Sequence, residues 1–356
     1  MKYIIVSGSS DIGTAIIDSL KKNKNYEIVY TYNSKKVMRF KNLTSLKLDL
    51  SSRGNIKKFV KKKELDNWDN LVVLSATQNP IGLFSETSSE DWVNSVDLNF
   101  TNQMFLIREL ISKKSKKNTI KNIILWAGTG SNSAPKYYSA YTISKIAQTK
   151  MTELLDKEFK DIKVSIIGPG WVKTKIHKQT IKAGKMAREN YDNTIERFRT
   201  NKFNSMKDVV NCFTKIVNLE KKIAGGRNFS VQFDKWGRKD LIKILDIDEN
   251  IYKLRRDFND FKFSDLQFNI IDILDLFLRN NSLNRPNSLI YKTFIRILHM
   301  RFILEQKGNK IDYIIRANDI SRVIDLYTKK SKNRKIIKNC LSSKPIKLKK
   351  LLSILK

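Results

Sequence analysis

Cysteine and histidine are scarce in this 356-residue sequence, which contains two of each. Cys212 and Cys340 lie far apart in the chain and have no metal-ligand companions. This pattern argues against a disulfide framework and suits a reducing compartment. No cluster of His, Cys and Asp residues has the spacing of a metal site, so we predict no bound metal.

Long hydrophobic runs are also missing. The N-terminal MKYIIVSGSSDIG contains only about four consecutive apolar residues, too few for the core of a signal peptide. No stretch approaches the roughly 18 uninterrupted apolar residues that a membrane-spanning helix needs. We therefore expect a soluble, cytoplasmic protein.

Acidic residues are outnumbered, with 35 Asp and Glu against 69 Lys and Arg, which gives a formal net charge of +34. Such a basic balance can attract nucleic acid, an anionic membrane or acidic substrates. A coding sequence biased toward A and T would also enrich Lys, Asn and Ile, and much of the lysine is scattered rather than patterned. Both explanations of the charge remain open.

What the sequence does have is alternation. Up to about residue 235, short apolar runs alternate with longer amphipathic stretches such as 14–23 and 90–114. Continuous apolar runs fit strands buried on both faces of a parallel sheet. The sequence therefore predicts an α/β fold with a Rossmann-like, doubly wound parallel sheet. The predicted strands are residues 2–6, 26–32, 45–50, 70–76, 122–127, 163–168 and 228–233.

The pattern changes after residue 235. We expect residues 1–258 to form one domain, whose last helical segment packs back onto the sheet, and residues 259–356 to form a basic, mostly helical appendage of unknown role. Basic amphipathic helices can lie on an anionic membrane surface, although a charged tail on a small helical bundle would look the same. Nucleic-acid binding is not expected, because the appendage has neither a zinc pattern nor an aromatic platform.

A phosphate-binding turn is predicted where the first strand meets the first helix, in VSGSSDIGTAII (6–17). Small residues allow the backbone to approach a pyrophosphate, and a helix N-terminus presents unpaired N–H groups and a positive dipole end. The predicted cofactor contacts in this turn are Gly8, Ser9, Ser10, Asp11, Ile12 and Gly13.

The end of the second strand, YTYNSKK (30–36), bears on the choice of cofactor. An NAD site would place a carboxylate near this point for the ribose 2′-hydroxyl, and none is present. Asn33, Ser34, Lys35 and Lys36 would instead accommodate a 2′-phosphate, so we predict NADP(H), although a solvated basic turn would read alike. Asp49, next to Leu50 after the third strand, is placed to hydrogen-bond an adenine amino group.

Tyr141 and Lys145 are the predicted catalytic pair. Four residues apart, they share one face of a helix, whereas neither Tyr137 nor Tyr138 has such a lysine. A free tyrosine titrates near pH 10, and a cation beside the phenolate would lower its pKa toward a useful range. The spacing therefore favours Tyr141 as the acid–base group.

The order of motifs completes a resemblance. A Gly-rich first turn, SAT after the fourth strand, DLNFTN, YTISK and PGWVKT follow one another at separations that resemble the short-chain dehydrogenase/reductase family over about residues 1–235. The resemblance implies that Tyr141 protonates the carbonyl oxygen during reduction and that Lys145 binds the nicotinamide ribose. It also implies that Asn99 holds a water in the proton relay, although a helix-surface amide would look the same.

The resemblance implies further cofactor contacts: Ser75 and Ala76 beside the cofactor, Pro169 and Gly170 around the nicotinamide, and Val172 and Thr174 at its carboxamide. It implies a homo-oligomer through the helices that contain Asn99 and Tyr141. Thr174 could equally be a helix cap.

Two positions depart from the family pattern. The loop SGSSDIG is one residue shorter than usual, and Asp11 replaces a glycine beside the expected pyrophosphate. The usual active-site serine, thirteen residues before the tyrosine, is Gly128. We expect Thr129 to supply the missing hydroxyl, with Ser131 as the alternative.

The segment after Thr174 indicates the substrate side. Residues 175–203, here named the lid segment, carry many cations, which predicts an anionic carbonyl substrate, although a solvated basic helix is an alternative. His177 within it is expected to be a surface histidine. WAGTGSN, QFDKW and YKLRRDF resemble a subset of the family encoded with surface-polysaccharide genes, which would imply a sugar or nucleotide-sugar.

The predicted function is thus an NADP(H)-dependent carbonyl reductase or alcohol dehydrogenase. The alternative is a catalytically inactive cofactor-binding scaffold whose basic C-terminal region recruits a membrane or protein partner. Gly128 at the serine position and Asp11 in the loop favour that alternative.

Overall fold

The computed structural model describes residues 1–255 except 35–36, 38–39, 41–42, 132, 235, 239–240, 243–244 and 247–248, together with the backbone of 314–315 and 346–347. The chain divides into two units, Met1–Arg255 and Arg256–Lys356. In the second unit, the described backbone forms two short antiparallel strands, β8 (Ile314–Ile315) and β9 (Ile346–Lys347). The predicted helical character and membrane contact of 259–356 fall on residues outside those described.

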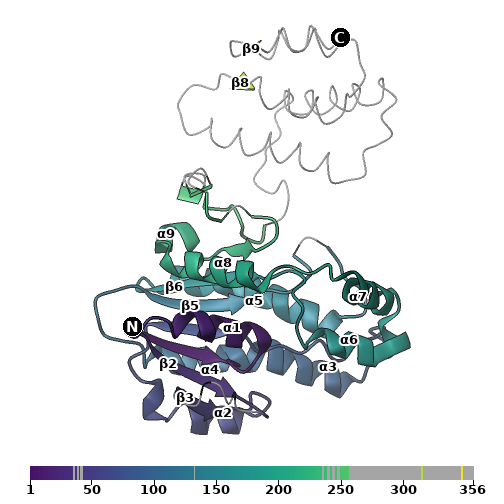
Figure 1. Ribbon diagram of the computed structural model, residues 1–356, viewed down its shortest axis with the longest axis horizontal. Coiled ribbons are helices and arrows are strands. Elements are labelled where there is room, and N and C mark those ends of the chain that lie inside the picture. The colour runs from purple at the N-terminus through teal and green to yellow at the C-terminus, as the bar shows by residue number, and fades with distance from the viewer. Residues whose placement is uncertain are drawn as a thin grey trace. The chain divides into compact units, whose positions relative to one another are not determined.

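A seven-stranded sheet, in which every neighbouring pair is parallel, forms the centre of the first unit (Figure 1). Its strand order is β3-β2-β1-β4-β5-β6-β7, so the winding reverses between β1 and β4. The strands are β1 (Lys2–Val6), β2 (Glu27–Tyr32), β3 (Thr44–Lys47), β4 (Asn70–Val73), β5 (Lys121–Trp126), β6 (Ile162–Gly168) and β7 (Asn228–Ser230). Each coincides with a predicted apolar run, and the doubly wound parallel sheet is confirmed.

Helices cover both faces of this sheet (Figure 1). On one face lie α1 (Asp11–Leu20) and α8 (Met206–Asn218), and on the other lie α2 (Arg53–Phe59), α4 (Asn102–Ile111) and α5 (Ser139–Glu158). A hydrophobic core lies on each face of the sheet, and alternate residues of a strand pack into one or the other. In β1, Ile5 packs with the helices of the first face and Ile4 with those of the second. Burial on both faces explains why the strands read as continuous apolar runs.

The amphipathic stretch 90–114 is helical as far as Ile111, as its spacing predicts, and contains a π-helical turn. It consists of α3 (Ser89–Val96), a π-helical turn η3 (Asp97–Thr101) and α4. The N–H of Asn102 donates to the carbonyl of Asp97, so the turn contains one residue more than an α-helical turn. Asn99 lies in this turn with its side chain fully buried.

The lid segment follows β6 and contains the helices α6 (His177–Ala183) and α7 (Glu189–Thr200), with a short 3₁₀ turn η4 (Gly184–Ala187) between them. Two other short elements are η2 (Lys63–Leu65) and α9 (Lys221–Ala224). Among the described residues, no helix has both the length and the apolar character that crossing a bilayer requires.

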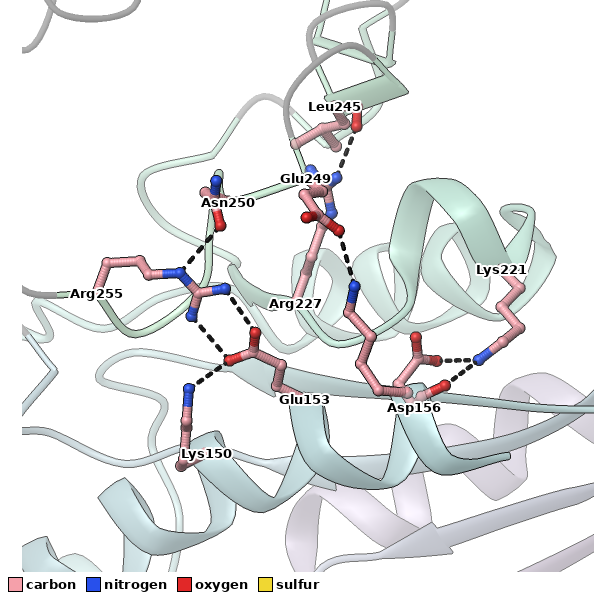
Figure 2. Close-up of polar contacts among 10 residues, drawn as sticks. Lys150, Glu153, Asp156, Lys221, Arg227, Leu245, Glu249, Asn250 and Arg255 are labelled. Carbon is pink, nitrogen blue, oxygen red and sulfur yellow. Dashed lines mark hydrogen bonds and ion pairs between the residues drawn. The ribbon is translucent and has the colours of Figure 1, made fainter. Parts of the chain in front are cut away.

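The end of the first unit returns to α5, as predicted for this segment (Figure 2). Leu245 is buried in the core, and its carbonyl accepts a hydrogen bond from Arg227 at 2.6 Å. Arg255 forms a two-bond ion pair with Glu153 of α5, at 2.5 and 2.8 Å, and Lys150 approaches the same carboxylate at 2.8 Å. The segment is therefore held by both apolar burial and buried charge.

Candidate active site

The turn between β1 and α1 is packed so closely that glycine is required. A Cβ added to Gly13 would lie 2.7 Å from the Cα of Gly8 and 2.8 Å from the carbonyl oxygen of Ser7. Ser10 caps α1 by accepting from the N–H of Gly13 at 3.1 Å. The first-turn N–H groups of an α-helix have no intrahelical acceptor, so the turn presents donors and a positive dipole end at the carboxyl edge of the sheet. This backbone cradle fits a pyrophosphate.

Asp11 is turned toward the lid segment. Its Oδ2 accepts from the backbone N–H of Lys175 at 2.6 Å, and its Oδ1 lies 3.5 Å from the Lys175 Nζ. The carboxylate that was expected beside the pyrophosphate therefore links the phosphate turn to the start of the lid segment. The charge of Lys175 offsets its own.

The ends of β1 and β4 meet where the sheet reverses. The hydroxyls of Ser7 and Ser75 are 2.5 Å apart, and the backbone N–H of Ser7 donates to the Thr31 hydroxyl at 2.8 Å. Ser75 is buried and Ala76 is partly exposed. In open α/β sheets, ligands bind in the crevice at this point.

On the adenosine side of the crevice, Asn33 and Ser34 are exposed directly after β2, while Lys35 and Lys36 lie outside the described residues. Asp49 follows β3, and its Oδ1 accepts from the backbone and the hydroxyl of Ser51 at 2.9 and 2.8 Å. Leu50 is buried. The structure thus brings Asp49 and the end of β2 to the same sheet edge, as predicted.

Tyr141 and Lys145 share a face of α5. The Lys145 Nζ lies 5.9 Å from the centroid of the Tyr141 ring. It donates to the carbonyl of Trp126 at 2.8 Å and to the Oε1 of Gln148 at 3.0 Å. The Lys145 side chain is 3% exposed, and burial lowers its pKa to about 7.

The expected depression of the tyrosine pKa is not observed. Burial, with a smaller contribution from Tyr138, raises the pKa of Tyr141 to about 12. The Lys145 amine is directed to Trp126 and Gln148 rather than to the phenol oxygen, so desolvation dominates. The phenol therefore holds its proton at neutral pH in this arrangement.

Gly128 makes room for the tyrosine. A Cβ at this position would lie 2.7 Å from both the Tyr141 hydroxyl and the Lys145 Cγ. Thr129 is exposed, and the hydroxyl of Ser131 lies 3.5 Å from the Asn228 Nδ2. Neither hydroxyl is hydrogen-bonded to Tyr141 in the described part of the chain, so the choice between them stays a prediction.

Asn99 acts as a clamp on the chain after β4. Its side chain accepts from the N–H of Thr77 and donates to the carbonyl of Thr77, both at 2.8 Å. Its backbone carbonyl accepts from the Gln148 Nε2 at 2.9 Å. The relay water that the resemblance implied at Asn99 stays a prediction.

Two glutamines that sequence reasoning missed join these residues. Gln148 bridges Lys145 and Asn99, and Gln103 accepts from the Gln148 Nε2 at 2.6 Å. Both are fully buried. The spacing in the sequence could have identified them. Gln148 lies three residues after Lys145 and Gln103 lies four residues after Asn99, so each shares a helix face with a predicted site residue, at a position where an apolar residue would be expected.

The segment after β6 is fixed by Asn204. Its Nδ2 donates to the Pro169 carbonyl at 2.9 Å, and its backbone N–H donates to the Trp171 carbonyl at 2.6 Å. Gly170 has a φ of +69°, which glycine adopts readily. PGWVKT follows directly on the carboxyl end of β6, with Val172 buried and Thr174 partly buried, and its predicted contacts with the nicotinamide stay predictions.

Three arginines of the lid segment are engaged with other side chains. Arg188 lies 3.8 Å from Glu86, Arg199 pairs with Glu196, and the Arg197 guanidinium stacks 4.5 Å above the Trp171 ring. His177 is not the surface residue that was expected. It is buried, stacks on Trp171 at 4.8 Å, and its Nε2 lies 2.9 Å from the Val172 carbonyl oxygen.

The neighbours of Tyr141 on the lid side are apolar or aromatic. Ile81, Tyr138 and Ala187 are buried in one cluster, with Tyr141, Ala183 and Tyr191 packed against it. The Tyr138 hydroxyl lies 2.8 Å from the Thr180 hydroxyl, which ties the start of α5 to α6. The lid segment therefore packs beside the tyrosine through uncharged side chains.

Comparison with known sequences places the first half of the chain. A family profile described as "short chain dehydrogenase" matches residues 2–185. Comparison with curated protein sequences gives no significant match.

Solved structures share the fold. A short-chain dehydrogenase/reductase from Saccharomyces cerevisiae is 18% identical, with a TM-score of 0.59 over 67% of this chain and 98% of that one. A 4-hydroxyisoleucine dehydrogenase mutant complexed with NADH and succinate is 19% identical, with a TM-score of 0.55 over 65% and 96%. A variant of actinorhodin polyketide ketoreductase with NADPH is 18% identical, with a TM-score of 0.55 over 65% and 95%.

Proposed function

The chain belongs to the short-chain dehydrogenase family, and on that premise we propose that it is an NADP(H)-dependent oxidoreductase acting on a carbonyl or hydroxyl substrate. The observation that carries the proposal is the placement of Tyr141 and Lys145 on one face of α5, at the sheet edge where the glycine turn also opens. An acid–base group and a phosphate cradle at one edge are what hydride transfer with a bound nucleotide requires.

The residues that would hold the cofactor line the crevice. The Gly8–Gly13 turn offers its backbone to the pyrophosphate, Asp49 lies on the adenosine side, and Pro169 with Gly170 borders the nicotinamide side. A bound nicotinamide supplies or accepts the hydride. Lys145 donates one hydrogen bond to the Trp126 carbonyl and one to Gln148. Because an ammonium has three N–H donors, one remains for the nicotinamide ribose.

The protein itself supplies the proton for the substrate oxygen. Burial keeps the Tyr141 phenol protonated at neutral pH, so it can serve as a proton donor at Oη to a carbonyl oxygen. The Asn99 side chain fixes the chain after β4 at Thr77, and the packing of Ile81, Tyr138 and Ala187 against Tyr141 excludes water from one side of the phenol.

We propose a carbonyl substrate that enters beside the lid segment. Lys178, Lys182 and Lys185 are exposed and are the groups there that could meet an anionic or sugar-based substrate. The link to polysaccharide synthesis rests on the sequence resemblance and has no support from a described contact.

Turnover tests the proposal. The purified protein should oxidise NADPH in the presence of members of a carbonyl panel, followed by the absorbance of the reduced nicotinamide. Tyr141→Phe should lower kcat by about 10²–10⁴-fold, the usual contribution of a general acid, while NADPH still binds. NADPH binding without turnover of any substrate would favour the inactive scaffold, which Gly128 at the serine position supports.

Cofactor preference is a separate prediction. NADPH should bind more tightly than NADH, and Lys35→Ala with Lys36→Ala should weaken NADPH binding by about tenfold while leaving NADH nearly unchanged. The matched control, Lys57→Ala with Lys58→Ala, removes the same charge from the last turn of α2. Equal affinities for the two cofactors, measured by fluorescence titration, would contradict the 2′-phosphate argument.

We also propose a homo-oligomer. Ile143 and Leu154 are 50% and 46% exposed on α5, and Val93 is 53% exposed on α3. Eleven residues separate Ile143 from Leu154, which is close to three helical turns, so the two side chains lie on one face. An apolar face of this kind on a helix is suited to pairing with a second copy.

A further inference from the structure

The environment of Lys145 is unusual for a lysine because its two inward partners are both neutral oxygens. They are the Trp126 carbonyl of β5 and the Oε1 of Gln148 on α5. No carboxylate contacts the amine in the part of the chain that the structure describes. The titratable group that faces it is Tyr141, which is itself neutral when protonated.

The side-chain amide of Gln148 can adopt one orientation only. Its nitrogen donates to two oxygens, the Asn99 carbonyl at 2.9 Å and the Gln103 Oε1 at 2.6 Å. A flip of the amide would set its oxygen against these two oxygens and its nitrogen against the lysine amine. The Gln148 oxygen is therefore fixed toward Lys145.

The side-chain amide of Gln103 is also held in one orientation. Its nitrogen donates to the Ser75 and Leu98 carbonyls, both at 2.9 Å, so its oxygen must face Gln148. Each amide in this row presents its oxygen on the lysine side and its N–H groups on the far side. All three side chains are at most 3% exposed, so water does not screen these dipoles.

We propose that Gln148 is a positioning residue that fixes the Lys145 amine in the active site and supports its charged form. The inference rests on the proposed function, because it concerns the lysine that would bind the cofactor ribose. The row of aligned amides stabilises a donor at its end, and an ammonium is a stronger donor than a neutral amine. This support opposes the desolvation that lowers the pKa of Lys145.

The test is the pH dependence of NADPH affinity, which needs no turnover. In the wild-type protein, affinity should be full below the lysine pKa and fall as the amine loses its proton. Gln148→Met keeps the length of the side chain but removes both donors and leaves only a weak acceptor. The alkaline fall in affinity should then begin about one pH unit lower, the scale of one charge-assisted hydrogen bond.

Gln148→Glu is the second variant, because it should raise the pKa of Lys145, whereas Gln148→Met should lower it. The second carboxylate oxygen meets the Asn99 carbonyl and the Gln103 Oε1, which lowers stability, but the first oxygen, ionised beside the ammonium, favours the charged form of Lys145. The alkaline fall should therefore move to higher pH. A residue with a purely structural role would lower NADPH affinity in both variants. It would not shift the pH at which affinity falls to lower values in one variant and to higher values in the other. Thermal unfolding of each variant shows that the measured protein is folded.

Thr152→Val is the matched control. Thr152 is fully buried one turn farther along α5, and its hydroxyl donates only to the backbone carbonyl of Gln148 at 2.8 Å. Its loss should leave the pH limb unchanged. If both Gln148 variants also share the wild-type limb, the positioning role is overturned while the proposed function stands. If the wild-type protein binds no NADPH, the proposed function itself fails.

Discussion

At the scale of single residues, position 128 and the Tyr141 phenol occupy adjoining space. The hydroxyl of Tyr141 lies where it would be 2.7 Å from a Cβ at position 128, so the glycine is part of how the tyrosine is seated. The family pattern has a serine there, and the pattern alone would predict that a return to serine restores a missing group. The packing indicates the reverse.

Gly128→Ser should impair the enzyme. The new side chain must displace Tyr141 or Lys145, an overpacking that costs about 1–3 kcal/mol, and kcat should fall by about tenfold or more. Gly54→Ser is the control, since a Cβ there would meet nothing nearer than the Ser52 hydroxyl at 3.6 Å. A Gly128→Ser variant with wild-type or higher turnover would show that the site tolerates the serine.

Local spacing correctly predicted that Tyr141 and Lys145 share one face of a helix and that Gly13 lies in a tight turn between a strand and a helix. The catalytic and cofactor-binding roles of these residues stay predictions. The direction of the tyrosine pKa was missed because it depends on where the lysine amine points. Gln148 directs that amine while bonded to Asn99, 49 residues away in the chain.

At the scale of elements, α5 carries more than the catalytic pair. Its outer end holds Glu153, whose carboxylate receives Arg255 and Lys150 (Figure 2). The Arg255 hydrogen bonds, followed by Lys150, lower the pKa of Glu153 to about 2. Because a depressed carboxylate pKa stabilises the folded state above the unfolded value, this stabilisation is lost as pH falls from about 4.5 toward 2.

Glu153→Gln should lower the free energy of unfolding at neutral pH by about 2–3 kcal/mol and remove that part of the acid sensitivity. Glu249→Gln is the control: its partner Lys157 and its own side chain are both mostly exposed, so its effect should stay within about 0.5 kcal/mol. Denaturant unfolding at several pH values measures both. Equal losses in the two variants would mean that the Arg255 pair adds nothing beyond a surface contact.

Element prediction was accurate for the sheet and for the helical character of 90–114, but it did not include the π turn. The strands β1, β4, β5 and β6 are buried on both faces almost throughout, so their apolar runs were visible without tertiary information. The stretch 90–114 has helical spacing throughout, and its division at Asp97–Thr101 leaves no mark in composition. The π turn is instead fixed by a tertiary contact, the pairing of the Asn99 amide with the backbone of Thr77.

At the scale of the whole molecule, the apolar face of α5 has a measurable consequence. Leu154→Glu with Ile143→Glu should reduce the apparent mass from that of an oligomer to that of a single chain, as measured by light scattering. Ile120→Glu is the control, since Ile120 is 45% exposed just before β5 and belongs to neither α3 nor α5. If the wild-type chain is already a monomer, the proposed homo-oligomer is wrong.

The π turn at Asp97–Thr101 also sets the phase of α3 relative to α4, that is, its rotation about the helix axis. One added residue rotates α3 by about 100° relative to α4, so the two helices present faces that a straight helix could not present together. Removing any single residue from this turn would shift that phase back and turn Asn99 away from Thr77. A sequence that lacks this extra residue, aligned here without a gap, would therefore match the wrong face of α3 or α4, although every strand stayed in register.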